Sequence, residues 1–147
     1  KSPEACSQTS NWSKKLSQAI VNFRKKQAVK TTEQLVHLIK ESYRFAGNRR
    51  FFIRTCSQVF QALRIEVNQE LTVLENFLET LIPYLNSGAR VAIITFHSLE
   101  DRIVKRFVKS QKYILEPLTK KVIKPGQDEI RQNSRASCAK LRVFRKV

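Results

Sequence analysis

Glycine is scarce in this sequence. The 147 residues contain three glycines, Gly47, Gly88 and Gly126, and no two of them form a GxG cluster. Gly-rich turns allow the backbone to approach the phosphates of a nucleotide or of a dinucleotide cofactor. The sequence therefore contains no Gly-rich cofactor turn. Because the chain also begins with Lys1 rather than Met, we interpret it as the C-terminal portion of a longer protein.

Cysteine pairs and long apolar runs are also absent. Cys6, Cys56 and Cys138 form no CxxC pair, so there is neither zinc-ligand spacing nor an even-numbered disulfide framework. We predict no metal site. Reduced thiols in a cytoplasmic compartment, bacterial-type or within an organelle, are the simplest interpretation. No apolar run approaches the roughly 20 residues of a membrane span, so no membrane partner is predicted.

Acidic residues are few: 12 Asp and Glu stand against 28 Lys and Arg, which gives a formal net charge of +16. The excess is uneven. Residues 102–147 contain 14 basic and 3 acidic residues, a net +11, whereas residues 1–101 contain 14 and 9, a net +5. A positive field concentrated in this way indicates a polyanionic partner such as nucleic acid. A basic surface that only keeps the protein soluble is the alternative.

One stretch combines a strand pattern with a cluster of polar side chains. Val91–Phe96 is an unbroken, β-branched apolar run, which predicts a strand covered on both faces. Ser98 lies three residues before Asp101, the spacing of a capping box, so we predict a helix that Ser98 caps. Ligands bind at the carboxyl ends of strands in open α/β sheets. His97, Glu100 and Asp101 at this end are therefore candidate site residues.

The remaining pattern predicts mainly helices before this stretch and strands after it. A polar loop or frayed end is expected over residues 1–11. Thr31 or Thr32 can cap a helix whose inner face includes Leu35 and Leu38. Apolar periodicity predicts helices at residues 12–26 and 57–81, joined in part by a connector at 49–54 that buries Phe52 and Ile53. After the signature stretch, the pattern predicts β-like structure at 113–124, a short helical turn at 127–132, and a half-exposed or edge strand at 139–147.

Three blocks carry a resemblance to a known family. Ile94–Phe107 closely resembles a signature of the MraW/RsmH family, S-adenosylmethionine-dependent methyltransferases that act on N4 of a cytosine in small-subunit ribosomal RNA. Phe60–Leu71 resembles a second family block. Arg54–Gln58 departs from the family's His-Pro-Ala-Thr-Arg stretch, so no role is carried over to it. The third block comprises Ile123–Pro125, Glu129, Ile130, Asn133 and Ala139–Val143.

The resemblance implies an α/β fold: the C-terminal part of a class I (Rossmann-like) methyltransferase domain plus part of a helical insertion domain. Residues 1–56 would belong to the insertion, which contributes to RNA recognition, and residues 57–147 to the methyltransferase domain. The last two strands would be its sixth and seventh, the seventh antiparallel. The implied cofactor is S-adenosylmethionine, with its binding residues expected in a preceding part of the protein. No cofactor-binding residue is assigned within this chain.

The resemblance also suggests roles. His97, Glu100 and Asp101 are the catalytic candidates, because acceptors beside an exocyclic amine can orient it and remove its proton. Asn68 and Glu70 are second-rank candidates, since they belong to the second block. The cations expected to bind RNA are Arg49, Arg50, Arg64, Arg102, Lys105, Arg106, Lys140 and Arg142.

The expected partner is small-subunit ribosomal RNA or the small ribosomal subunit, and a homo-oligomer is left open. Two other functions compete with the enzyme. One is a non-catalytic RNA-binding module, a degenerate relative that keeps the basic face. The other is a helical protein-interaction domain, which explains the apolar stripe of residues 57–81 but not the charge.

Overall fold

The computed structural model describes the backbone of residues 4–43, 47–119 and 121–147, and side chains from Trp12 onward within those ranges. Residues 1–3, 44–46 and 120, which include part of the predicted N-terminal loop and Lys120 of the β-like segment, lie outside the described residues. The chain divides into two compact units, residues 1–64 and 65–147. The predicted boundary, after residue 56, lies eight residues earlier.

Unit 1 contains α1 (Glu4–Lys26), α2 (Thr32–Ser42) and most of α3 (Arg49–Asn68). Its core consists of Leu16, Leu35, Leu38 and Ile39, with aromatic side chains of α1 and α3 packed around them. The predicted cap of α2 is confirmed: the Thr31 hydroxyl accepts from the Gln34 N–H, and Gln34 completes the capping box.

Two local predictions in unit 1 are wrong. Residues 4–11, expected as a loop or frayed end, are helical; Ser, Gln and Asn without glycine can extend an adjacent helix at modest cost. The connector expected at residues 49–54 begins α3, because the Asn48 side chain accepts from the Phe51 N–H and so caps the first turn. Phe52 packs on the core, but Ile53 is 52% exposed rather than buried.

Unit 2 begins within α3 and continues into α4 (Glu70–Leu81), where one helix over residues 57–81 was predicted. The helix is interrupted at Gln69, whose φ of +52° places it in the left-handed region. A residue in that conformation cannot continue a right-handed helix. The apolar stripe did not reveal the interruption, because no Gly or Pro marks it in the sequence.

The sheet of unit 2 has three strands in the order β1-β3-β2: β1 (Arg90–Thr95), β3 (Lys140–Lys146) and β2 (Leu115–Pro117). Both pairings are antiparallel, as the resemblance implied for the last strand. β3 is the central strand and not an edge, since it pairs on both sides. The predicted short helix is confirmed as α6 (Gln127–Gln132). Among its described residues, unit 2 also contains two 3-10 segments, η1 (Ile82–Tyr84) and η2 (Ser134–Cys138).

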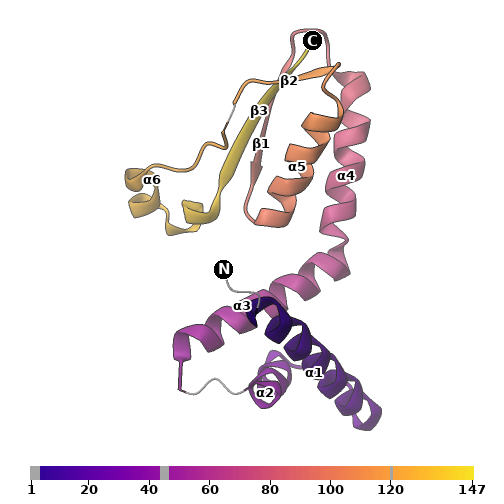
Figure 1. The fold of residues 1–147 in the computed structure, drawn as a ribbon, viewed down its shortest axis with the longest axis vertical. Helices are drawn as coiled ribbons and strands as arrows, with labels where there is room; N and C mark the ends of the chain where they lie inside the picture. Colours follow the sequence, from indigo (N-terminus) through magenta and orange to yellow (C-terminus); the bar gives the residue numbers. More distant parts are fainter. Residues whose placement is uncertain (1–3, 44–46, 120) are drawn as a thin grey trace. The chain divides into compact units, whose positions relative to one another are not determined.

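One face of this sheet is covered by α5 (Ser98–Ser110), which packs beside α4 (Figure 1). Val91 and Ile93 of β1 and Phe144 of β3 point to that face and pack with Val108. The prediction that β1 is covered on both faces is wrong for the described chain. Its side chains alternate, and Ile94 on the opposite face is 60% exposed.

Candidate active site

The turn between β1 and α5 is built around His97. This residue is the N-cap of α5, and its Nδ1 atom accepts from the Glu100 N–H at 3.3 Å. In return, Glu100 Oε2 accepts from the N–H groups of Phe96 at 2.8 Å and His97 at 3.1 Å. The capping box predicted for Ser98 and Asp101 is therefore wrong by one residue. Ser98 is the better intrinsic cap, but the Glu100 carboxylate satisfies two N–H groups and fixes the helix start at His97.

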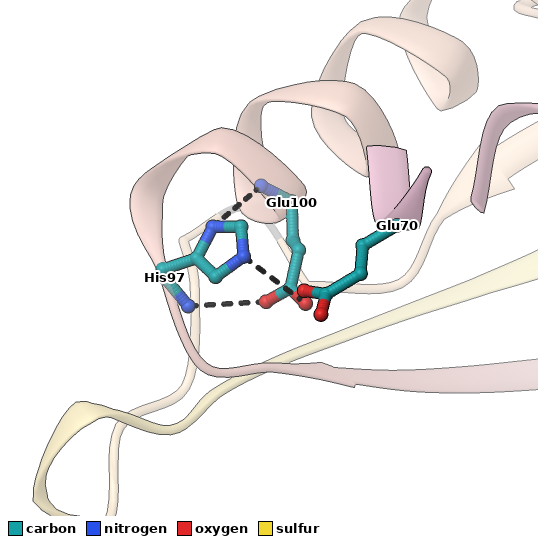
Figure 2. Close-up of side chains that lie close together, drawn as sticks. All are labelled: Glu70, His97 and Glu100. Atoms are coloured by element: carbon teal, nitrogen blue, oxygen red, sulfur yellow. Dashed lines mark hydrogen bonds and ion pairs between the residues drawn. The ribbon is translucent and has the colours of Figure 1, made fainter. Parts of the chain in front are cut away.

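Glu70 joins this turn from the first position of α4. Glu70 and Glu100 each place one carboxylate oxygen, and His97 one ring nitrogen, so that the three atoms lie within 4.8 Å of one another. All three residues are half-buried, and Figure 2 shows their side chains together. Asn68 Nδ2 donates to Glu70 Oε1 at 3.2 Å. Packing of α4 against α5 thus brings the two second-rank candidates, Asn68 and Glu70, to the turn that holds His97 and Glu100. We call Glu70, His97 and Glu100 the His–carboxylate cluster.

The capping bond determines which nitrogen of His97 carries the proton. Because Nδ1 accepts from a backbone N–H, the neutral ring carries its proton on Nε2. Nε2 lies 3.3 Å from Glu100 Oε1, but it is buried and has no aligned hydrogen-bond partner. The His97 side chain is only 11% exposed. The cluster therefore holds a buried N–H donor beside two carboxylates.

The donor set of the cluster, one imidazole and two carboxylates, is of a kind that binds divalent metals. The tautomer argues against that use. Nε2 can coordinate a metal only if Nδ1 carries the ring proton, and Nδ1 faces the Glu100 N–H donor. Coordination would thus break the N-cap bond of α5. The local hydrogen bonds therefore favour a cluster that acts through hydrogen bonds, with the Nε2–H of His97 as the donor and the two carboxylates as acceptors, rather than through a bound metal.

Asp101 points away from this cluster, toward β3. Its two carboxylate oxygens accept from Arg142, from Nε at 2.7 Å and from Nη2 at 3.2 Å, and both side chains are less than one-fifth exposed. The Arg142 hydrogen bond lowers the pKa of Asp101 below its usual value; partial burial opposes the shift, and the charges of Arg142, Lys140 and Lys105 reinforce it. A catalytic candidate and an RNA-binding candidate are therefore engaged with each other, and they fasten α5 to β3.

The other cations expected to bind RNA are distributed over both units. On α5, Arg102, Lys105 and Arg106 are exposed, whereas Lys140 at the start of β3 is half-buried. The remaining three, Arg49, Arg50 and Arg64, are exposed on α3 in unit 1.

The His–carboxylate cluster lies at the carboxyl end of β1, the end of a strand at which α/β sheets bind ligands, and the strongly basic chain favours a polyanionic partner. The chain belongs to the MraW methylase family, whose sequence profile matches residues 8–147.

Three curated relatives, each named ribosomal RNA small subunit methyltransferase H, illustrate the similarity. The chain is 42% identical to the Hydrogenobaculum protein over 88% of this chain and 43% of the relative. It is 43% identical to the Leptospira interrogans protein over 92% and 41%, and 44% identical to the Acaryochloris marina protein over 92% and 44%. The chain thus spans less than half the length of these relatives.

In the part of the chain that the structure describes, no helix combines the length and apolar character needed to cross a bilayer.

Proposed function

We propose that this chain acts within a longer enzyme that transfers a methyl group from S-adenosylmethionine to N4 of a cytosine in small-subunit ribosomal RNA. The proposal is supported by the family match and by the names of the relatives. The observation that carries it is the His–carboxylate cluster. His97 and Glu100 lie within the signature stretch Ile94–Phe107, and Glu70 lies within the second family block, Phe60–Leu71. The substrate would be ribosomal RNA or the small subunit, in the cytoplasm of a bacterial-type cell.

The finer architecture is part of the same proposal. Unit 2 would form the C-terminal part of a class I, Rossmann-like methyltransferase domain, with β1, β2 and β3 as its fifth, sixth and seventh strands. Residues 1–56, which lie within unit 1, would form part of a helical insertion that contributes to RNA recognition, and residues 57–147 would belong to the methyltransferase domain.

S-adenosylmethionine supplies an electrophilic methyl group. Two cavities of unit 2, of about 450 and 280 Å³, are not lined by Glu70, His97 or Glu100, and the resemblance implies that the cofactor-binding residues lie in a preceding part of the protein. No residue of this chain is therefore assigned to the cofactor, and the carboxyl end of β1 is assigned to the acceptor base.

The lone pair of an exocyclic cytosine amine is delocalised into the ring, so a catalyst must orient the amine and accept its proton. Carboxylate oxygens of Glu70 and Glu100 are acceptors of the required kind. Two backbone N–H groups hold Oε2 of Glu100, which keeps its carboxylate fixed. The buried Nε2–H of His97 lies 3.3 Å from Glu100 Oε1 and positions the carboxylates. In this proposal Asp101 positions α5 through its bonds to Arg142. The target base is unstacked before it reaches the carboxyl end of β1.

The test is methyl transfer to small ribosomal subunits by the longest native protein, with His97→Asn as the main variant. An Asn oxygen can still accept the N–H of Glu100, so the helix cap survives while the Nε2–H is lost. We expect His97→Asn to fold normally and to methylate at least about 100-fold more slowly. His97→Ala should be similarly slow and also less stable by about 1 kcal/mol.

Ser98→Ala is the matched control, because Ser98 is exposed and makes no capping bond in the structure. It should retain both rate and stability. A wild-type rate in a folded His97→Asn variant would remove His97 from the reaction. A native protein that binds subunits in a salt-dependent way but transfers no methyl group would instead be the non-catalytic RNA-binding relative.

A further inference from the structure

A cavity of about 450 Å³ lies between the C-terminal half of α5 and strands β2 and β3. This volume falls within the ~300–1,000 Å³ range of small-ligand sites. Its floor is apolar and includes Val108, Leu115 and Phe144, which belong to the core of unit 2. The cavity takes no part in the chemistry proposed above, and none of its lining residues belongs to the His–carboxylate cluster.

The rim of this cavity is positively charged. Lys105 and Lys109 lie one helical turn apart on α5, and Lys112 follows in the turn after the helix. None of the three forms an ion pair within the described part of the chain. The charged neighbours are already engaged, because Arg142 binds Asp101 and Glu116 binds Arg145. The rim therefore presents three exposed cations without an ion-pair partner among the described residues, and Lys112 Nζ lies 4.8 Å from the centre of the Tyr113 ring.

An apolar floor with several cations at its edge complements a ligand that has one flat, weakly polar part and adjacent anionic groups. A nucleotide of a single strand has this chemistry, since its base is flat and its phosphates are charged. We propose that the cavity binds one unstacked base of the RNA, with neighbouring phosphates on Lys105, Lys109 and Lys112. This inference rests on the proposed function, because it takes RNA as the partner.

The cavity would hold a nucleotide other than the one that is methylated. Lys109 lies twelve residues after His97, which corresponds to about 18 Å along the axis of α5. A base bound here would therefore anchor the strand at a distance from the target cytosine. Such an anchor would fix the register of the RNA on the protein while a different nucleotide occupies the carboxyl end of β1.

The test measures binding of the longest native protein to a fluorescently labelled single-stranded RNA over a range of salt concentrations. The main variant is the triple substitution Lys105→Gln, Lys109→Gln and Lys112→Gln. Loss of three phosphate contacts should reduce the slope of log K against log salt by about 2 and weaken binding on the order of 100-fold at 0.1 M salt. An unchanged melting temperature would show that the triple variant still folds, since all three lysines are exposed.

The matched control removes equal charge from unit 2 outside the cavity, as Lys121→Gln, Lys124→Gln and Arg135→Gln. This control variant should change the slope by less than about 0.7, the contribution of one phosphate contact to a single strand. An equal loss in both triple variants would overturn the proposal, because it would show a diffuse electrostatic effect. A free mononucleotide that binds as tightly as the strand would overturn it as well.

The role of the base is tested separately with two modified strands. A strand that carries 4-thiouridine should cross-link on irradiation to peptides containing Val108, Leu115 or Phe144. A strand with abasic positions should bind the wild-type protein more weakly than the matched normal strand. Equal binding of the abasic and normal strands, or cross-links confined to other peptides, would show that no base enters the cavity.

Methyl transfer by the same preparations separates this proposal from the proposed function. Normal methylation by a lysine triple variant that also binds RNA normally would overturn the cavity proposal alone. A wild-type protein that does not methylate, but whose RNA binding depends on the three lysines, would overturn the enzyme proposal and support the cavity.

Discussion

The ion pair between Asp101 and Arg142 gives the sharpest test of how unit 2 is held together. Asp101→Asn keeps one carbonyl oxygen for Arg142 but removes the negative charge and one of the two hydrogen bonds. Exposed ion pairs contribute up to about 1 kcal/mol, and loss of one partner of a fully buried pair costs about 3–5 kcal/mol. The two side chains are 16% and 17% exposed, between these cases, so we expect a loss of about 2 kcal/mol.

For a unit of this size, a loss of about 2 kcal/mol corresponds to a decrease in melting temperature of about 8–16 °C. The assay is urea and thermal unfolding of Asp101→Asn, Arg142→Met and the double variant. The loss of unfolding free energy in the double variant should be smaller than the sum of the two single losses by a coupling of about 1–2 kcal/mol. Additive single effects, with no coupling, would refute the reasoning that the two groups stabilise the fold through each other.

The pH dependence gives a second readout of the same pair. Arg142 lowers the pKa of Asp101 in the folded state, so the stability that Asp101 contributes is fully present above its unfolded pKa of about 3.9. That contribution is lost as the pH falls through the lower, folded pKa. The free energy of unfolding of the wild type should therefore decrease more steeply below about pH 4 than that of Asp101→Asn. Parallel pH profiles in this range would contradict the shift.

Two further substitutions test the local structure of the helices. Thr31→Ala should destabilise unit 1 by about 1 kcal/mol because it removes the cap of α2, whereas Thr31→Ser should be nearly neutral; chemical unfolding of both variants provides the comparison. Gln69→Val should cost about 1–2 kcal/mol more than Gln69→Gly, because a β-branched side chain is strained at a φ of +52° and glycine is not. Equal stability of the two Gln69 variants would show that the helix is continuous in solution.

Local sequence determined much of this protein. The β-branched run at Val91–Phe96 specified a strand, and the spacing of Thr31 and Gln34 specified a capped helix start. The signature from Ile94 to Phe107 pointed to the family to which the chain belongs. These features could be predicted because their energies arise from contacts within about one helical turn or one strand, where residue type and spacing are sufficient.

Competition between neighbouring residues limited that local reasoning. Ser98 and His97 were both available to cap α5, and residue preference favoured Ser98. The Glu100 carboxylate decided for His97, since from that position it accepts the N–H groups of both Phe96 and His97. Single-residue propensities differ by a few tenths of a kcal/mol to about 1 kcal/mol, so two additional charge-assisted bonds can reverse them.

Only the tertiary structure decided which distant residues meet. Asp101 and Arg142 are 41 residues apart, and nothing in their spacing indicated that they would neutralise each other rather than contact a substrate or a phosphate. Glu70 reaches His97 and Glu100 because α4 packs beside α5 and begins anew after Gln69. β3 became the central strand by pairing on both sides, although its sequence alternates like that of an edge. Such outcomes depend on the packing of whole elements, and the free energy of that packing is not contained in any local segment of the sequence.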